Sequence, residues 1–192
     1  MDLKHTDELC AAVKAGDADR AKRAIEAGDS IFSGRVWGVE KPPIVWAAMT
    51  GDSECIRALL DAGAKVDARG DMGDTALMWV VSKGRRDCMA VLLAAGADVN
   101  AFDNSGMTVA MWAARCGANK EASLIDTLVE AGADLRPTDS MRRTAATHAK
   151  IGGAREMAAL IKGRIAAMDE AKKLARAIKN KPLVSSPTSL RM

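Results

Sequence analysis

The sequence predicts an all-α solenoid built from stacked helix pairs, and its internal spacing leads to that prediction. Residues of the same kind recur every 33 positions along the middle of the chain. They are Trp46, Trp79 and Trp112 and, five positions later, Gly51, Gly84 and Gly117. A fixed period of this length indicates that one small unit repeats and that successive units stack to bury a continuous core.

Each unit is expected to contain two short helices joined by a glycine turn. The segments 55–60 (CIRALL) and 88–93 (CMAVLL) place apolar residues three and four positions apart, which is typical of a helix with one buried stripe. A glycine follows each segment, at 63 and at 96, and is expected to end the helix. An extended polar stretch then leads to the next unit.

The composition excludes several classes of protein. The chain has 192 residues, 28% of them charged, and contains no run of about 18 apolar residues that could span a membrane. Its first ten residues, MDLKHTDELC, lack the basic start and apolar run of a secretory signal. We therefore expect a cytoplasmic protein.

The cysteines and histidines do not predict a metal site. Cys55 and Cys88 occupy the same apolar position of successive units, which favours buried thiols over a disulfide. No CxxC pair occurs, and His5 and His148 are the two histidines of the chain. We expect neither a metal nor a cofactor.

The segments 59–81 (LLDAGAKVDARGDMGDTALMWVV) and 92–114 (LLAAGADVNAFDNSGMTVAMWAA) resemble ankyrin repeats, both in their period and in the pattern "GADVNA" followed by glycine and threonine. The resemblance implies a repeat of helix, turn, helix and a finger-like hairpin loop, stacked into a curved solenoid. It covers about residues 6–163. It predicts a repeat domain over 1–163, with units at about 6–35, 36–69, 70–102, 103–138 and 139–163.

The sequence departs from the family pattern in two ways. The first finger is two residues longer than the 33-residue period allows, and three extra residues fall near 116–123. The family's "TPLH" box reads PPIV, TALM, TVAM and TAAT here, so its histidine is replaced by Val45, Met78, Met111 and Thr147. We therefore expect apolar packing to hold the repeats together more than the polar network of that histidine.

The residue after the box faces the concave side of the solenoid in ankyrin repeats, and here it is Trp46, Trp79, Trp112 and His148. One interpretation is that these rings pack against neighbouring helices. The other is that they bind a partner, since tryptophan is enriched where a few residues carry most binding energy. Both can hold, and the 3% aromatic content of the chain favours binding.

Ankyrin proteins also bind partners with their finger tips, and the resemblance assigns further contact residues by position. Four of them, Trp37, Met72, Phe102 and Met107, are large apolar groups on loops and predict an apolar interaction patch. The other finger positions are Val39, Lys41, Arg69, Asp71, Asp74, Asn104, Ser105, Met141 and Arg143, and Lys83 and Arg115 are expected to form a polar rim.

The C-terminal segment has a different character. Residues 164–181 predict a basic helix, and residues 182–192 a flexible tail after Pro182. Residues 162–192 hold eight Lys and Arg against Asp169 and Glu170, a net charge of +6, so the rest of the chain carries −3. The helix is expected to cover the last repeat. An anionic membrane, nucleic acid or a secretion machine is an alternative docking surface for it.

The sequence contains no constellation of residues typical of an enzyme. No phosphate-binding glycine motif occurs, and His148 and Cys116 are expected to lie too far apart for a nucleophile and base. We therefore expect a non-catalytic, monomeric protein that binds a partner protein as inhibitor, adaptor or targeting subunit. Nucleic acid and membrane are not expected partners. The alternatives are a tether that docks through its basic helix, or an effector or immunity protein that uses the same groove.

Overall fold

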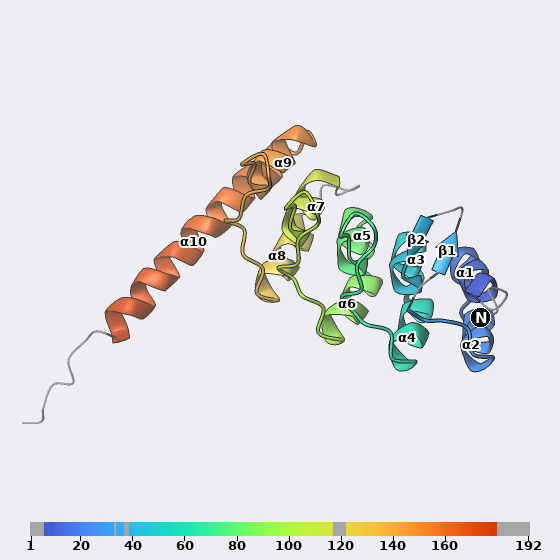
Figure 1. Cartoon of the computed structure of the whole chain (residues 1–192). Helices are drawn as coiled ribbons and strands as arrows, with labels where there is room; N and C mark the ends of the chain where they lie inside the picture. Colours follow the sequence, from blue (N-terminus) through green and yellow to red (C-terminus); the bar gives the residue numbers. More distant parts are fainter. Residues whose placement is uncertain (1–5, 33, 37–38, 117–121, 180–192) are drawn as a thin grey trace, which may run out of the picture.

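The computed structural model describes residues 6–32, 34–36, 39–116 and 122–179. Its helices follow one another in pairs along the chain (Figure 1). The first helices of the pairs are α1 (Thr6–Ala15), α3 (Pro43–Thr50), α5 (Ala76–Ser82), α7 (Val109–Cys116) and α9 (Ala145–Ile151). The second helices are α2 (Ala18–Glu26), α4 (Ser53–Asp61), α6 (Arg86–Ala94), α8 (Ala122–Glu130) and α10 (Arg155–Lys179).

The pairs stack into two layers. In one layer α1, α3, α5, α7 and α9 each contact the next, and in the other α2 contacts α4 and α4 contacts α6. One continuous apolar core runs between the layers. The predicted all-α repeat solenoid is therefore confirmed, while the division into five units with the stated boundaries stays a prediction.

Side-chain caps begin several of the helices where the sequence changes from loop to helix. The Thr75 hydroxyl accepts a hydrogen bond from the Met78 N–H at 3.4 Å, and the Thr144 hydroxyl accepts one from Thr147 at 3.3 Å. Asp52 caps α4 through the N–H groups of the first turn. Such caps satisfy amide groups that have no partner inside the helix.

Hairpin loops, which we call fingers, connect the pairs. The first finger (27–42) contains the antiparallel strands β1 (Gly34–Val36) and β2 (Val39–Lys41), with Val36 opposite Val39. The second (62–75), third (95–108) and fourth (131–144) are tighter, and Phe102 bridges to Thr108 in the third. The first finger is two residues longer than the others, as the spacing of the sequence predicts.

Three of the four residues that replace the family histidine pack in the core, as their apolar character predicts, while the polar Thr147 is half-buried. Val45 and Met78 are fully buried and Met111 is 1% exposed. The expectation that packing dominates is nevertheless incomplete, because the fingers carry a polar network of their own, described below. The extra residues near 116–123 fall mostly outside the described part of the chain.

The C-terminal helix differs from the one predicted. Instead of a separate helix over 164–181, one helix, α10, runs from Arg155 to Lys179 and passes through Gly163 without a break. A single glycine inside a helix costs only about 1 kcal/mol, and strong helix formers flank it. The predicted tail at 182–192 lies outside the described residues.

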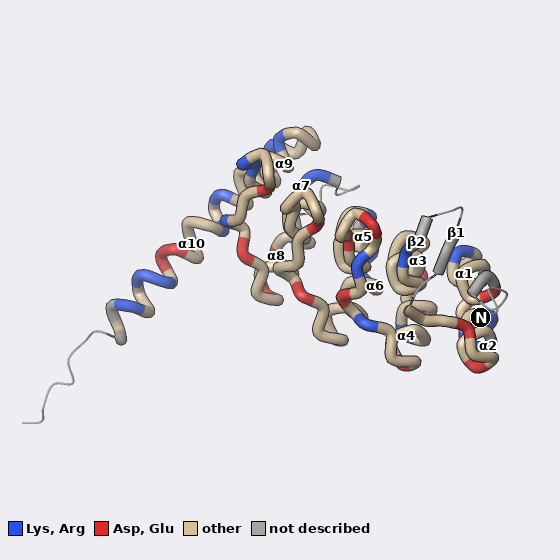
Figure 2. The backbone as a smooth tube through the Cα atoms, in the orientation of Figure 1, with Lys and Arg blue, Asp and Glu red and all other residues tan. Residues whose placement is uncertain are grey.

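The two halves of α10 have different surroundings. Met157, Ala158 and Ile161 are buried, and the helix contacts α9 and α8. Beyond Asp169 every described side chain is exposed, and the helix extends past the stacked pairs (Figure 1). Lys and Arg dominate this distal half (Figure 2). The first half therefore forms the second helix of the last pair, while the distal half covers none of the residues that the structure describes.

None of the described helices combines the length and apolar content needed to cross a membrane.

Candidate functional site

A carboxylate from the adjoining finger holds each of the last two rings that the sequence singles out. The Trp112 indole N–H donates to Asp103 Oδ2 at 2.9 Å, and His148 Nε2 lies 2.9 Å from Asp139 Oδ2. Both aspartates precede their ring by nine positions. They also accept backbone N–H groups of their own finger, as when Asp103 Oδ1 receives Met107 at 2.9 Å. One side chain thus shapes the finger and ties it to the first helix.

The second finger reaches the same arrangement from a different position. Nine residues before Trp79 stands Gly70, which has no carboxylate, and Asp74 supplies one instead. The Trp79 indole N–H donates to Asp74 Oδ2 at 2.6 Å. A Cβ atom at residue 70 would lie 2.6 Å from Asp74 Oδ1, so the glycine leaves room for this carboxylate. The carboxylate that binds the ring therefore stands at position 74 in the second finger, instead of at position 70, and the hydrogen bond to the indole is kept.

Trp46 lacks this support. The residue nine positions before it is Trp37, so the first finger has no carboxylate at that place. The Trp46 Nε1 atom is buried and has no hydrogen-bond partner within the described part of the chain. A buried donor without an acceptor lowers stability, and among the described residues Trp46 is held by packing against the core.

A buried lysine joins the first finger to the second. Lys41, 6% exposed, places its Nζ atom 2.8 Å from Asp74 Oδ2 and 2.8 Å from Asp71 Oδ1. It also lies 5.9 Å from the centroid of the Trp79 ring. Burial lowers the pKa of Lys41, but the hydrogen bonds and charges of Asp71 and Asp74 outweigh that effect and raise it above its ordinary value. The ammonium group therefore stays charged inside the interface.

Asp139 is the corresponding anion of the fourth finger. Burial raises the pKa of Asp139, but hydrogen bonds from the Arg143 N–H, from His148 and from the Arg143 side chain outweigh it, so the pKa lies well below its ordinary value. The Arg143 guanidinium approaches Asp139 Oδ2 at 2.7 Å. The carboxylate is thus stabilised in its charged form.

This depressed pKa predicts a loss of stability in acid. A group whose pKa is lower in the folded state stabilises the fold above its unfolded value, about 3.9 for Asp, and loses that contribution as the pH falls towards the folded value. In urea titrations from pH 7 to pH 3, the advantage of the wild type over Asp139→Asn should shrink below about pH 4. An advantage that stays constant over this range would contradict the assignment.

The tryptophans also contact one another. The Trp79 and Trp112 ring centroids lie 5.4 Å apart with an interplanar angle of 63°, an edge-to-face arrangement. Trp46, Trp79 and Trp112 are half-buried against the core. These contacts support the packing interpretation of the tryptophan series, and a part of each ring remains exposed.

The finger tips, by contrast, present apolar side chains to solvent. Met72 is 50% exposed, Phe102 58% and Met141 70%. Arg69 donates to the Phe102 carbonyl at 2.6 Å and its guanidinium lies over the Phe102 ring. Asn104 N–H donates to the Met72 carbonyl at 2.9 Å, so the second and third tips are linked. The tips therefore form one supported surface rather than separate loops.

A pocket of about 260 Å³ opens between these tips and α7. Met72 lies on one side of it, and the third finger and α7 supply the rest. The full lining is Met72, Asp103, Ser105, Met107, Trp112 and Arg115. The pocket joins residues that the sequence assigns to the finger tips with others that it assigns to the first helices.

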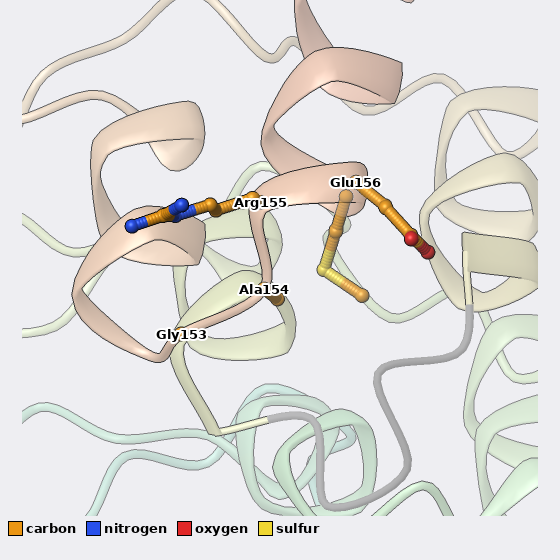
Figure 3. Close-up of a pocket in the computed structure, with 5 residues that line it drawn as sticks. Gly153, Ala154, Arg155 and Glu156 are labelled. Carbon is orange, nitrogen blue, oxygen red and sulfur yellow. The ribbon is translucent and has the colours of Figure 1, made fainter.

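Another pocket, of about 250 Å³, lies at the start of α10 and carries less chemistry. Consecutive residues from Gly153 to Met157 line it. The Arg155 and Glu156 side chains extend in opposite directions (Figure 3), so no polar groups converge there. We do not assign a site to it.

The structure corrects four of the predicted contact residues. Lys41 is 6% exposed and Asp74 and His148 are fully buried, so they support the surface from beneath instead of offering it to a partner. Met107, 4% exposed, does not project from a finger tip but lines the wall of the pocket beside α7. Trp37 and the Val39 side chain lie outside the described residues. Asp71, Ser105, Asn104, Lys83 and Arg115 are exposed, and Arg143 is half-buried.

Sequence reasoning overlooked Asp103 and Asp139, which anchor Trp112 and His148. A signal was present, because each aspartate keeps the same nine-residue distance from its ring. Gly70 hid the pattern, since the second finger breaks it at that position.

Comparison with known families now identifies the fold. A family model described as ankyrin repeats, in three copies, matches residues 9–103. The chain is an ankyrin-repeat protein. No protein of curated function shows a significant match to the sequence.

Ankyrin repeats are generally modules for protein–protein interaction, and the family is typically non-catalytic. Within the described residues, no three His, Cys, Asp or Glu side chains gather as a possible metal site. The exposed finger tips and the pocket beside them are therefore the surface on which a function can be argued.

Proposed function

We propose that this ankyrin-repeat protein is a non-catalytic module that binds a partner protein through its finger tips and concave face. The observation that carries the proposal is the row of exposed apolar tips, Met72, Phe102 and Met141, on three successive fingers. Exposed apolar groups gathered on one surface mark interaction sites. The same surface serves an inhibitor, an adaptor or a targeting subunit.

The chemistry of the buried groups supports a non-catalytic role in the cytoplasm. The His148–Asp139 pair has the geometry of an oriented base, but His148 is fully buried and out of reach of a substrate. Cys55 is a buried thiol whose pKa burial raises to about 12, with the hydrogen bond to Asp52 adding to the shift. Such inert buried thiols fit a reducing compartment.

The test is affinity capture from an extract of the source cells with a finger-tip variant, Met72→Ser/Phe102→Ser/Met141→Ser. These side chains are exposed, so each change should alter the free energy of unfolding by no more than about 0.5 kcal/mol. Partners of the wild-type protein should be lost. Trp79 and Trp112 are unsuitable for this test, because their indoles hold the fingers in place.

A matched control removes exposed apolar groups elsewhere. Leu174 and Ile178, 63% and 67% exposed on the distal half of α10, are changed to Ser. Partners that survive this change and disappear with the finger-tip variant support the proposal. Partners lost only with the α10 variant, and lost steeply between about 50 and 200 mM salt, would instead indicate the alternative of a basic tether.

A further inference from the structure

The pocket between the second and third finger tips has a definite chemical character. Met72, Met107 and Trp112 give it apolar walls. At about 260 Å³ it is smaller than the roughly 300–1,000 Å³ of most small-molecule sites. A volume of this size suits one or two side chains of a protein segment better than a cofactor.

Arg115 brings to this pocket a positive charge that has no ion-pair partner among the described residues. It is exposed, and its Nη1 atom donates to the Met107 sulfur at 3.4 Å. A thioether is a weak acceptor, and no ion pair to Arg115 occurs among the described residues. The planar guanidinium has five donors and binds a carboxylate with two parallel hydrogen bonds. Among the described residues, most of that hydrogen-bonding capacity is unused.

The carboxylate that lines the same pocket, Asp103, already has hydrogen-bond donors from its own finger and from α7. Asp103 is 6% exposed, and its two oxygens accept the N–H groups of Ser105, Met107 and the Trp112 indole. It does not pair with Arg115. Its buried negative charge disfavours a doubly charged phosphate in the pocket, and phosphate recognition uses clusters of arginines rather than one. A single carboxylate therefore fits best.

We propose that this pocket receives a short linear segment of the partner in which an aspartate or glutamate neighbours a long apolar side chain. The carboxylate binds the Arg115 guanidinium, and the apolar side chain lies between Met72, Met107 and the exposed part of Trp112. The inference rests on the proposed protein-binding function and adds the chemistry of the bound segment. The thioethers adapt to side chains of different shape, so the carboxylate supplies the specificity.

The experiment is a selection of random twelve-residue displayed peptides on the full chain, run in parallel on Arg115→Glu and Arg115→Gln. The wild type should enrich Asp or Glu next to Leu, Met or Phe. Arg115→Glu should replace that acidic preference by Lys or Arg, and Arg115→Gln should abolish it while the apolar preference stays. Lys22→Glu, a charge reversal at an exposed residue of α2 outside the pocket lining, should leave the acidic preference unchanged.

A selected peptide then gives a quantitative check. Changing its acid to the amide should weaken binding to the wild type by about tenfold or more, and should have little effect on Arg115→Gln. Circular dichroism is used to check that each variant is folded. If Arg115→Glu does not fold, the comparison is made with Arg115→Gln. An acidic preference that persists in both Arg115 variants, apolar peptides without acid, or no selected peptide would each overturn the inference. Loss of partners in the finger-tip variant would still support the broader function.

Discussion

Replacing Asp74 by Met is expected to lower the free energy of unfolding by about 3–5 kcal/mol, as is typical when one member of a buried ion pair is removed. Asp74 is fully buried and accepts hydrogen bonds from Lys41 and from the Trp79 indole. Without it the buried ammonium keeps only Asp71, which is 54% exposed. Urea unfolding measured by circular dichroism gives the difference directly.

Its controls use the exchange of roles between positions 70 and 74. Gly70→Asp alone should destabilise the protein, because the new Cβ would crowd Asp74 and Lys41. Gly70→Asp/Asp74→Met recreates the order of the third finger, with Asp103 and Met107, and should recover most of the loss. Asp71→Asn should lower the free energy of unfolding much less than Asp74→Met does, because the Asp71 carboxylate is exposed. If the losses in unfolding free energy of Gly70→Asp and Asp74→Met simply add in the double variant, the idea that position 70 can supply the carboxylate in place of position 74 is wrong.

Trp112→Ala is expected to lower the free energy of unfolding by about 3 kcal/mol, the lower end of the range for aromatic truncations in a core, because the ring is half-buried. The ring packs edge to face against Trp79, contacts the core and donates to Asp103. Its removal leaves a cavity and takes a donor from a buried carboxylate. Thermal and urea unfolding should both report the loss.

Replacement by phenylalanine separates the indole N–H from the rest of the ring. Trp112→Phe should cost about 1.5–3 kcal/mol, the range for hydrogen bonds to charged groups, plus a packing term. Trp46→Phe provides the matched comparison, because the Trp46 N–H is buried without an acceptor in the described part of the chain. That change should be closer to neutral. Equal costs at the two positions would mean that the carboxylate contributes nothing.

The paired helices and their order could be predicted because they depend on local regularities. The 33-residue spacing of Trp46, Trp79 and Trp112 places them at the same point of successive units. Glycines after each helix and apolar stripes within it predict where the helices end and which side is buried. The end of the repeats was harder, since Gly163 is only a weak interruption inside α10.

The candidate site was predicted in outline and corrected in detail. Met72, Phe102 and Met141 lie exposed on finger tips, as their positions imply. Lys41 and His148 have the same polar character in the sequence as an exposed contact residue, yet both are buried beside a carboxylate. Burial depends on what the neighbouring unit places against a side chain, which composition and spacing do not report.

The sequence by itself therefore determined the repeat, its helices and the positions that share one surface, because a constant period forces equivalent residues into register. Only the tertiary structure decided which of those residues support the surface and which form it. The Asp74 carboxylate occupies the space beside Gly70 and takes the place of the carboxylate that this position lacks. Arg115 lines one pocket together with Met107 and Met72 of the second finger tip. Such contacts join residues from different positions of the repeat and from different units. Their energies depend on distance and burial in the folded chain.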